Sequence, residues 1–371
     1  MRVGIDYRPV VAAPYSGIAR QVLGMEEVIV DHDHLTLLRF SPCSAANTLK
    51  EKMCVPPWQS DDNGLHRPLQ RLRFEFQFLP SAVQEQALDI YIATANQGLP
   101  MWRRGTKIKS ILLLHDIFQL TLKEDGHQSK LKRMAYRCID YISIRLSVTQ
   151  ADFIWVPSEY TKGEAIKHFP KVESKIRVLP NLVRPLTQAI DEKPMYGFPD
   201  KYWLLVGTSE PRKNIPWFIR AWKKMRANNV NIPDLVVVGS SMDVPEFLRE
   251  EVGLYFKTEI DDETLSALYT YADLFWMPSY AEGFGLPVIE ALSTGTPVAV
   301  ANGSSLDDIT PDSAWRFDPC ETEALCQLMT RVSEQPSAEG DTKEKRKQWA
   351  SNFAMRAYSK RLKELLEEAQ K

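Results

Sequence analysis

The sequence is poor in cysteine, and its few cysteines form no recognisable site. Five occur in 371 residues, none of them in a C-x-x-C pair. An odd number of scattered cysteines argues against a disulfide framework and against a structural zinc module. This composition favours a protein of a reducing compartment.

Long hydrophobic runs are also missing. The longest, such as Ile111–Leu114, are far shorter than the roughly 20 apolar residues that a membrane-spanning helix needs. Met1–Asp6 reads as a strand and has no apolar core of signal-peptide length. We therefore expect a cytoplasmic protein, at most attached to the inner face of the cytoplasmic membrane.

The chain lacks an excess of charge of either sign. Lys and Arg number 46 and Asp and Glu 48, for a net charge of -2. A dedicated nucleic-acid binder normally carries a strong basic excess, so nucleic acid is not an expected partner. Hydrophobic residues at 44% and charged residues at 25% are typical of a soluble globular protein, and the length suits two domains.

Short apolar strands alternate with amphipathic helical stretches, which predicts parallel sheets covered by helices. The expected strands are Val3–Ile5, Thr36–Phe40, Ile90–Ala93, Ser110–Leu114, Phe153–Val156, Arg177–Leu179, Trp203–Val206, Leu235–Val238, Leu254–Phe256, Leu274–Met277 and Pro297–Val300. The proline-rich, aperiodic segment Pro180–Pro199 separates two series of strands and reads as a linker. We predict one domain over residues 1–188, with a terminal helix at 352–371 packing back onto it, and a second over 189–351.

The most informative loop follows the strand Leu274–Met277 and reads S-Y-A-E-G-F-G-L-P-V-I-E, from Ser279 to Glu290. In open parallel sheets, ligands bind at the carboxyl ends of strands. Gly283 and Gly285 allow a ligand to approach the backbone, and the following helix offers free N–H groups. Glu282 and Glu290 could both accept hydrogen bonds from sugar hydroxyls. A tight turn followed by a helix-favouring glutamate is the plainer interpretation.

The E-G-F-G-L-P-x-x-E pattern resembles the donor site of retaining glycosyltransferases of family four, which have the GT-B fold. The resemblance extends over nearly the whole chain. It implies two Rossmann-like, doubly wound parallel-sheet domains facing a cleft, the second of which binds the sugar nucleotide. It also implies that Glu282 holds hydroxyls of the transferred sugar and that the amides of Phe284, Gly285 and Leu286 approach the sugar and diphosphate. Glu290 would bind the ribose.

A second loop follows the strand Trp203–Val206 and ends in E-P-R-K-N. Fixed cations stabilise a departing diphosphate without a metal, and we assign this role to Arg212 and Lys213. Many relatives place a further arginine where this chain has Thr208, so the division of labour between the two cations stays open. Alone, the segment could be a solvated basic turn.

Two residues of the first half complete the predicted site. In the resembling family a glycine after the first strand lets the diphosphate approach, and Gly17 fits that place. A histidine at the end of the Ser110–Leu114 strand contacts the donor sugar there, which corresponds to His115. Without the family pattern, a turn glycine and a structural histidine would explain both.

No metal site is expected. Asp31–His34 alternates Asp and His, but no matching ligands follow at a recognisable spacing, so a solvated turn is the better interpretation. Transferases of the resembling type need no bound metal. Basic and aromatic residues interleave at 66–80, 101–109 and 130–133, a composition that suits an anionic membrane surface as well as ordinary solvated helix faces.

The T-S-E-P-R-K-N loop resembles that of bacterial mannosyltransferases that build O-antigen and similar polysaccharides. The resemblance implies transfer of mannose from GDP-mannose to a lipid-linked oligosaccharide or polyprenyl-linked glycan. The alternatives are a UDP-sugar-dependent transferase of the same fold, a GT-B sugar-nucleotide epimerase or hydrolase, and a catalytically silent binding protein. No G-x-G-x-x-G follows the first strand of either domain, which disfavours a nicotinamide dehydrogenase.

Overall fold

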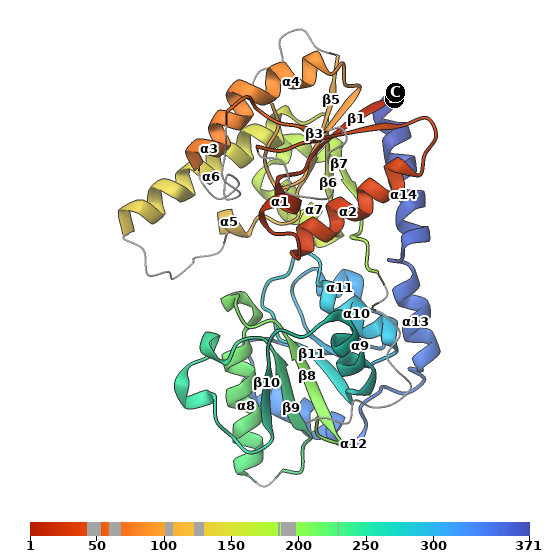
Figure 1. Ribbon diagram of the computed structural model, residues 1–371. Helices are drawn as coiled ribbons and strands as arrows, with labels where there is room; N and C mark the ends of the chain where they lie inside the picture. Colours follow the sequence, from red (N-terminus) through yellow and green to blue (C-terminus); the bar gives the residue numbers. More distant parts are fainter. Residues whose placement is uncertain are drawn as a thin grey trace. The chain divides into compact units, whose positions relative to one another are not determined.

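The computed structural model describes residues 1–42, 53–58, 68–100, 107–121, 130–184, 186, 198–228 and 230–371. The chain divides into two compact units, each with its own sheet (Figure 1). Unit 1 comprises Met1–Leu182 and Tyr358–Lys371, and unit 2 comprises Val183–Ala357. Most of the expected linker, including residues 187–197, lies outside the described residues.

Unit 1 contains a parallel sheet of seven strands in the order β3-β2-β1-β4-β5-β6-β7. The strands are β1 Arg2–Asp6, β2 Thr36–Phe40, β3 Met53–Cys54, β4 Ile90–Ala93, β5 Lys109–Leu113, β6 Phe153–Val156 and β7 Ile176–Val178. The helices are α1 Arg8–Ala12, α2 Gly17–Val30, α3 Pro68–Arg73, the π-helix η1 Phe74–Phe78, α4 Leu79–Glu85, α5 Phe118–Thr121, α6 Lys130–Gln150, α7 Glu159–His168, the 3-10 helix η2 Pro170–Lys175 and the larger part of α14 Met355–Gln370.

Unit 2 contains a parallel sheet of six strands in the order β10-β9-β8-β11-β12-β13. The strands are β8 Tyr202–Val206, β9 Asp234–Val238, β10 Leu254–Lys257, β11 Leu274–Met277, β12 Val298–Ala301 and β13 Trp315–Phe317. The helices are α8 Ile215–Ala227, α9 Asp262–Tyr271, α10 Leu286–Thr294, α11 Leu306–Ile309, α12 Thr322–Glu334 and α13 Lys343–Ser351, with the 3-10 turns η3 Pro211–Lys213, η4 Ser241–Asp243 and η5 Glu246–Leu248.

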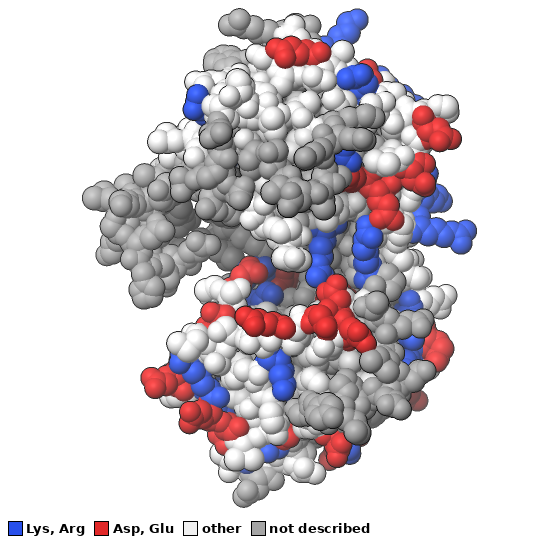
Figure 2. Space-filling view, in the orientation of Figure 1, with Lys and Arg blue, Asp and Glu red and all other residues white. Residues whose placement is uncertain are grey.

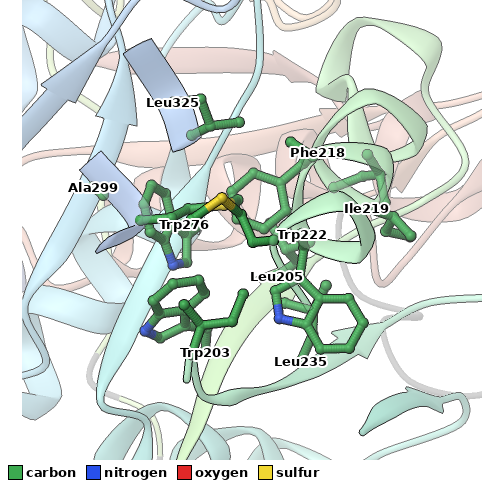
Figure 3. Packing of buried hydrophobic residues seen from close by; sticks show 14 of the residues in the cluster. Trp203, Leu205, Phe218, Ile219, Trp222, Leu235, Trp276, Ala299 and Leu325 are labelled. Atoms are coloured by element: carbon green, nitrogen blue, oxygen red, sulfur yellow. The ribbon is translucent and has the colours of Figure 1, made fainter. Parts of the chain in front are cut away.

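Unit 2 has an apolar core on each face of its sheet, as alternation along β8 shows. Trp203 and Leu205 belong to the core beneath α8 and α12, whereas Tyr202 and Leu204 belong to the core beneath α9 and α10. In the first core the ring of Trp276 lies 5.1 Å from that of Trp203 and 5.0 Å from that of Phe218 (Figure 3). Aromatic pairs at these spacings stabilise a core beyond their area burial. This packing fixes β8 and β11 side by side.

All of the predicted strands were found, each to within one residue at both ends. Two were missed, because β3 and β13 are only two and three residues long and show no alternation that a pattern could reveal. The predicted terminal helix begins at Met355 rather than at Asn352, and it is preceded by the separate helix α13.

The strand order of each sheet reverses at one place. In unit 1 this is between β1 and β4, and in unit 2 it is between β8 and β11. Loops that leave neighbouring strands in opposite directions open a crevice at such a point, and ligands bind there in doubly wound folds. The loops after β8 and β11 are the two that the sequence singled out.

Candidate functional site

The site of unit 2 consists of the segments that follow β8 and β11. The first runs from Gly207 through the turn η3 to Asn214, and the second from Pro278 to Gly285 at the start of α10. The backbone N–H of Tyr280 donates to the carbonyl of Arg212 over 3.0 Å. This bond joins the two segments across the strand-order reversal.

Lys213 reaches back over the start of its own loop. Its ammonium lies 3.4 Å from the carbonyl oxygen of Val206. Gly207 has a φ of +89°, and a Cβ at this position would lie 2.1 Å from the lysine Nζ. A glycine is therefore required for both conformation and space. No carboxylate among the described residues pairs with Lys213, which leaves its charge available to an anionic ligand.

Arg212, by contrast, is bound to three protein groups. Its Nε and Nη2 contact one carboxylate oxygen of Glu210 at 2.7 and 2.6 Å. Its Nη1 donates to the carbonyl of Ala281 over 2.9 Å and lies 2.5 Å from Oε2 of Glu282. Burial by itself would lower the pKa of Arg212, but the carboxylates of Glu282 and Glu210 raise it. The sequence left the division of labour between Arg212 and Lys213 open, and the contacts of the two side chains differ.

The two carboxylate oxygens of Glu282 differ in their contacts. Its residue is 6% exposed, and while Oε2 faces Arg212, Oε1 is buried with no hydrogen-bond partner among the described residues. The hydroxyl oxygens of Ser279 and Ser305 are buried and unpartnered in the same way. Ser305 is adjacent, since its backbone N–H donates to the carbonyl of Glu282 over 3.3 Å. Buried polar atoms without partners are rare, and together these three suit a ligand rich in hydroxyl groups.

The start of α10 has the conformation that the glycine-rich loop predicts. Gly285 caps the helix with a φ of +96°, and a Cβ there would lie 2.6 Å from the Leu306 side chain. Phe284 points into the core, with its ring 5.6 Å from that of Phe353. Phe284 therefore offers a ligand only its backbone. Leu286 contributes the first N–H of the helix, and this helix end favours negative charge. Pro287 has no N–H, and the N–H of Val288 donates to the carbonyl of Gly285 over 3.0 Å.

Glu290 lies in the second turn of α10 and is 7% exposed. Its Oε2 accepts a hydrogen bond from the hydroxyl of Tyr269 on α9 over 3.1 Å. Tyr269 thus orients the carboxylate predicted to bind ribose, a partner that no sequence pattern indicated.

Thr208 occupies the place where many relatives have an arginine. Its hydroxyl donates to Oδ2 of Asp243 over 2.7 Å, and it packs against Gly239, where a Cβ would lie 2.3 Å from the threonine Oγ1. Thr208 is almost fully buried. The hydrogen bond to Asp243 therefore joins the loop after β8 to the loop after β9.

In unit 1, His115 lies two residues after the end of β5, and its imidazole ring has a defined tautomer. Its Nε2 lies 2.8 Å from the carbonyl oxygen of Thr94. A carbonyl only accepts, so Nε2 carries the proton and Nδ1 is left as an acceptor. The backbone N–H of His115 donates to Asn96 over 2.7 Å. Burial lowers the pKa of the imidazole, although the Thr94 carbonyl and Asp116 act in the opposite direction. The ring is therefore neutral at pH 7.

The other predicted features of unit 1 occupy helix starts and turns. Gly17 is the first residue of α2 and is exposed, directly after Ser16, whose hydroxyl accepts from the N–H of Ala19. Ser158 caps α7 by accepting from the N–H of Thr161. Asp31–His34 forms the turn between α2 and β2. Among the described residues no group of three His, Cys, Asp or Glu is placed to hold a metal ion.

The basic segments proposed for membrane contact separate in the structure. Arg71 is buried and pairs with Asp140 at 3.0 Å, so it is not available to lipid. Arg73 is exposed, with its guanidinium 4.2 Å from the centre of the Trp58 ring. Residues 66–67 and 101–106, and the side chains of 130–133, lie outside the described residues. No described helix is long and apolar enough to cross a bilayer. On the face in Figure 2, described positive and negative side chains are interspersed.

Comparison with known proteins agrees with this geometry. Residues 191–354 match the family model of glycosyl transferases group 1. The chain is 26% identical over 233 residues to O-antigen chain mannosyltransferase B of Escherichia coli, and 25% identical over 254 residues to O-antigen chain mannosyltransferase RfbU of Salmonella typhimurium. These alignments cover 58% and 67% of this chain, and only 59% and 66% of the relatives.

The fold is shared with solved structures along its whole length. Sucrose-phosphate synthase from Thermosynechococcus elongatus superposes with a TM-score of 0.75 at 17% identity, over 99% of this chain and 98% of that one. The chain has the GT-B fold, with two Rossmann-like units, as expected from the sequence. The resemblance to family-four glycosyltransferases is likewise confirmed.

Proposed function

We propose that this chain, whose residues 191–354 match the family model of glycosyl transferases group 1, moves mannose from GDP-mannose to a glycan acceptor with retention of configuration. The observation that carries the proposal is Glu282, whose Oε1 is buried without a hydrogen-bond partner among the described residues while Arg212 holds its Oε2. In the loop after β8, Lys213 pairs with no carboxylate of the described part of the chain. A carboxylate oxygen without a donor and a lysine without an anionic partner, each within the described residues, together suit a sugar joined to a phosphate.

In the proposed reaction, the bond between the sugar C1 and the diphosphate oxygen breaks, and C1 forms a bond to the acceptor hydroxyl oxygen. Lys213 and the N–H of Leu286 at the start of α10 stabilise the negative charge on the leaving diphosphate. The departing diphosphate takes the acceptor proton on the same face of the sugar. No metal is needed in this scheme, because the protein supplies the compensating charge.

The other predicted residues take supporting roles. Glu282 accepts hydrogen bonds from hydroxyls of the sugar, and Glu290 accepts from the ribose. The acceptor Nδ1 of His115 is suited to a hydroxyl near the reacting carbon, and Gly17 leaves room for the diphosphate and acceptor. These roles follow the family pattern, and each can be tested by substitution.

Mannose and GDP are favoured by the E-P-R-K-N loop and by the mannosyltransferase names of the relatives. The acceptor in this proposal is a lipid-linked or polyprenyl-linked oligosaccharide of O-antigen or similar polysaccharide synthesis. The protein would meet it at the inner face of the cytoplasmic membrane. Co-sedimentation with anionic vesicles tests that contact, and recovery of all the protein in the supernatant would contradict it.

Calorimetric titration without metal, using GDP, GDP-mannose, UDP and UDP-glucose, tests the donor. Selective binding of the guanine nucleotides is the expected result. Preference for the uridine nucleotides would keep the reaction and replace the donor. Consumption of GDP-mannose at full rate without an acceptor would indicate a hydrolase or epimerase instead. Binding of none of the four would overturn the proposed function.

A further inference from the structure

The role of Arg212 can be separated from that of Lys213, although the two are adjacent in sequence. Three nitrogens of the Arg212 guanidinium contact Glu210, Ala281 and Glu282. These contacts use the directions in which a planar guanidinium donates. Few N–H groups of the Arg212 guanidinium are therefore left to donate to a diphosphate. Within the described part of the chain, the neighbouring lysine has one hydrogen-bond contact, 3.4 Å long, to the carbonyl of Val206.

The contacts of Arg212 join the two loops of the site. Glu210 belongs to the loop after β8, and Ala281 and Glu282 belong to the loop after β11. The arginine carbonyl accepts the N–H of Tyr280 over 3.0 Å, so the backbone and side chain of one residue hold the same segment. The Glu282 carboxylate is consequently fixed at Oε2, and Oε1 is the oxygen left for a ligand.

We propose that Arg212 is a positioning residue that orients Glu282 toward the hydroxyls of the transferred sugar, and that Lys213 is the cation that receives the diphosphate. This inference rests on the proposed function and refines it. Arg212 acts on the sugar half of the donor through Glu282. Lys213 acts on the diphosphate half directly.

Titration of each variant with both GDP and GDP-mannose tests the separation. Arg212→Lys keeps the charge, but one ammonium cannot hold Glu210, Ala281 and Glu282 at the same time. We expect Arg212→Lys to weaken GDP-mannose binding about tenfold while GDP binding changes less than about twofold. Lys213→Ala should weaken both ligands about tenfold or more, because both contain the diphosphate.

A double-mutant cycle shows whether Arg212 works through Glu282. Glu282→Gln should weaken GDP-mannose binding without affecting GDP, and adding Arg212→Lys to it should cause little further loss. The pair Arg212→Lys and Lys213→Ala should instead be additive. Glu210→Gln weakens the contact between Arg212 and a half-exposed carboxylate. It should reduce the affinity for GDP-mannose by a smaller factor and leave the affinity for GDP unchanged.

Thermal unfolding of every variant identifies those that are misfolded, and Glu210→Gln provides the mildest substitution should Arg212→Lys unfold. Equal weakening of GDP and GDP-mannose by Arg212→Lys would overturn the proposal and make Arg212 a diphosphate ligand. Unchanged binding of both would overturn it as well. If the wild type prefers uridine nucleotides, the same comparison is made with UDP and UDP-glucose. A wild type that binds none of them refutes the proposed function itself, and the positioning role with it.

Discussion

Each sheet carries a cluster of charged side chains where its strand order reverses. The two clusters differ in whether a buried carboxylate oxygen is left without a hydrogen-bond partner among the described residues. In unit 1, Arg8 follows β1 and contacts Asp6 at 2.7 Å and Glu75 of the π-helix η1 at 3.0 Å. All three residues are at most 2% exposed. In unit 2, Arg212 follows β8 and likewise bridges two carboxylates, but one of these, Glu210, is half-exposed.

Arg8 is also more tightly surrounded by protein than Arg212. A Cβ at Gly98 would lie 2.3 Å from Nη2 of Arg8, and the Arg8 guanidinium lies 4.7 Å from the centre of the Phe74 ring. The cluster of unit 1 is therefore enclosed by protein. In the cluster of unit 2, the buried Oε1 of Glu282 has no hydrogen-bond partner among the described residues. A charge cluster closed on itself anchors a fold, whereas one with an unfilled acceptor is prepared for a ligand.

The largest expected effect is loss of stability on opening the closed cluster. Arg8→Met should lower the free energy of unfolding by about 3–5 kcal/mol, because it leaves Asp6 and Glu75 buried without a cation. Arg212→Met is the matched control and should cost clearly less, since the Arg212 side chain is 18% exposed. Urea unfolding of both variants measures the difference. Equal losses of unfolding free energy would show that the Arg8 cluster does not stabilise the fold more than the Arg212 cluster does.

The next effect concerns catalysis in unit 2. Lys213→Ala should lower kcat about a hundredfold, since it removes the cation that faces the leaving diphosphate. Steady-state kinetics with donor and acceptor measure this. Lys201→Ala, at an exposed position before β8, is the control and should be neutral. Near-normal turnover of Lys213→Ala would remove this residue from the mechanism.

A smaller effect is expected from the carboxylate held by Tyr269. Glu290→Gln should weaken nucleotide binding about tenfold, because a neutral amide replaces a charged acceptor of the ribose hydroxyls. Tyr269→Phe removes the hydrogen bond that orients Glu290 and should weaken binding less. Calorimetry with GDP alone isolates this contact from the sugar. An unchanged dissociation constant for Glu290→Gln would contradict the assignment.

The smallest effect is the pH dependence conferred by His115 in unit 1. Burial holds its pKa below the usual 6.5, so the unfolded chain binds a proton more readily than the folded one. The stability that follows is present above about pH 6.5 and is lost as the pH falls through the folded pKa. His115→Gln keeps a donor for the Thr94 carbonyl without titrating.

Unfolding free energies at about pH 7.5 and about pH 5.5 test this. The wild type should lose more stability on acidification than His115→Gln, because all other titrating groups are common to both. An equal loss in the two proteins would show that the imidazole is not kept neutral by the fold.

Much of the fold could be predicted because its information is local. Strands such as Thr36–Phe40 and Leu274–Met277 are buried apolar runs bounded by turn residues, and they were placed without error. The glycines of the β11–α10 loop are required by backbone conformation, as Gly285 illustrates. For the same reason the loop that carries Glu282 could be recognised from sequence.

The partners of the charged groups were decided only by the tertiary structure. Arg8 and Glu75 are 67 positions apart, and Arg212 and Ala281 are 69 apart. Side chains so distant meet only once the strand order has brought their loops together, and no local pattern encodes that order. Arg71 was predicted on an exposed basic face and is instead buried against Asp140.

The sequence by itself therefore determined the two parallel sheets, the loops at their carboxyl ends and the residue types that those loops present. It could not determine which of two neighbouring cations is engaged by protein and which is left for a ligand. That distinction depends on where β8 and β11 lie beside each other, because the carboxylate that binds Arg212 comes from the other strand's loop.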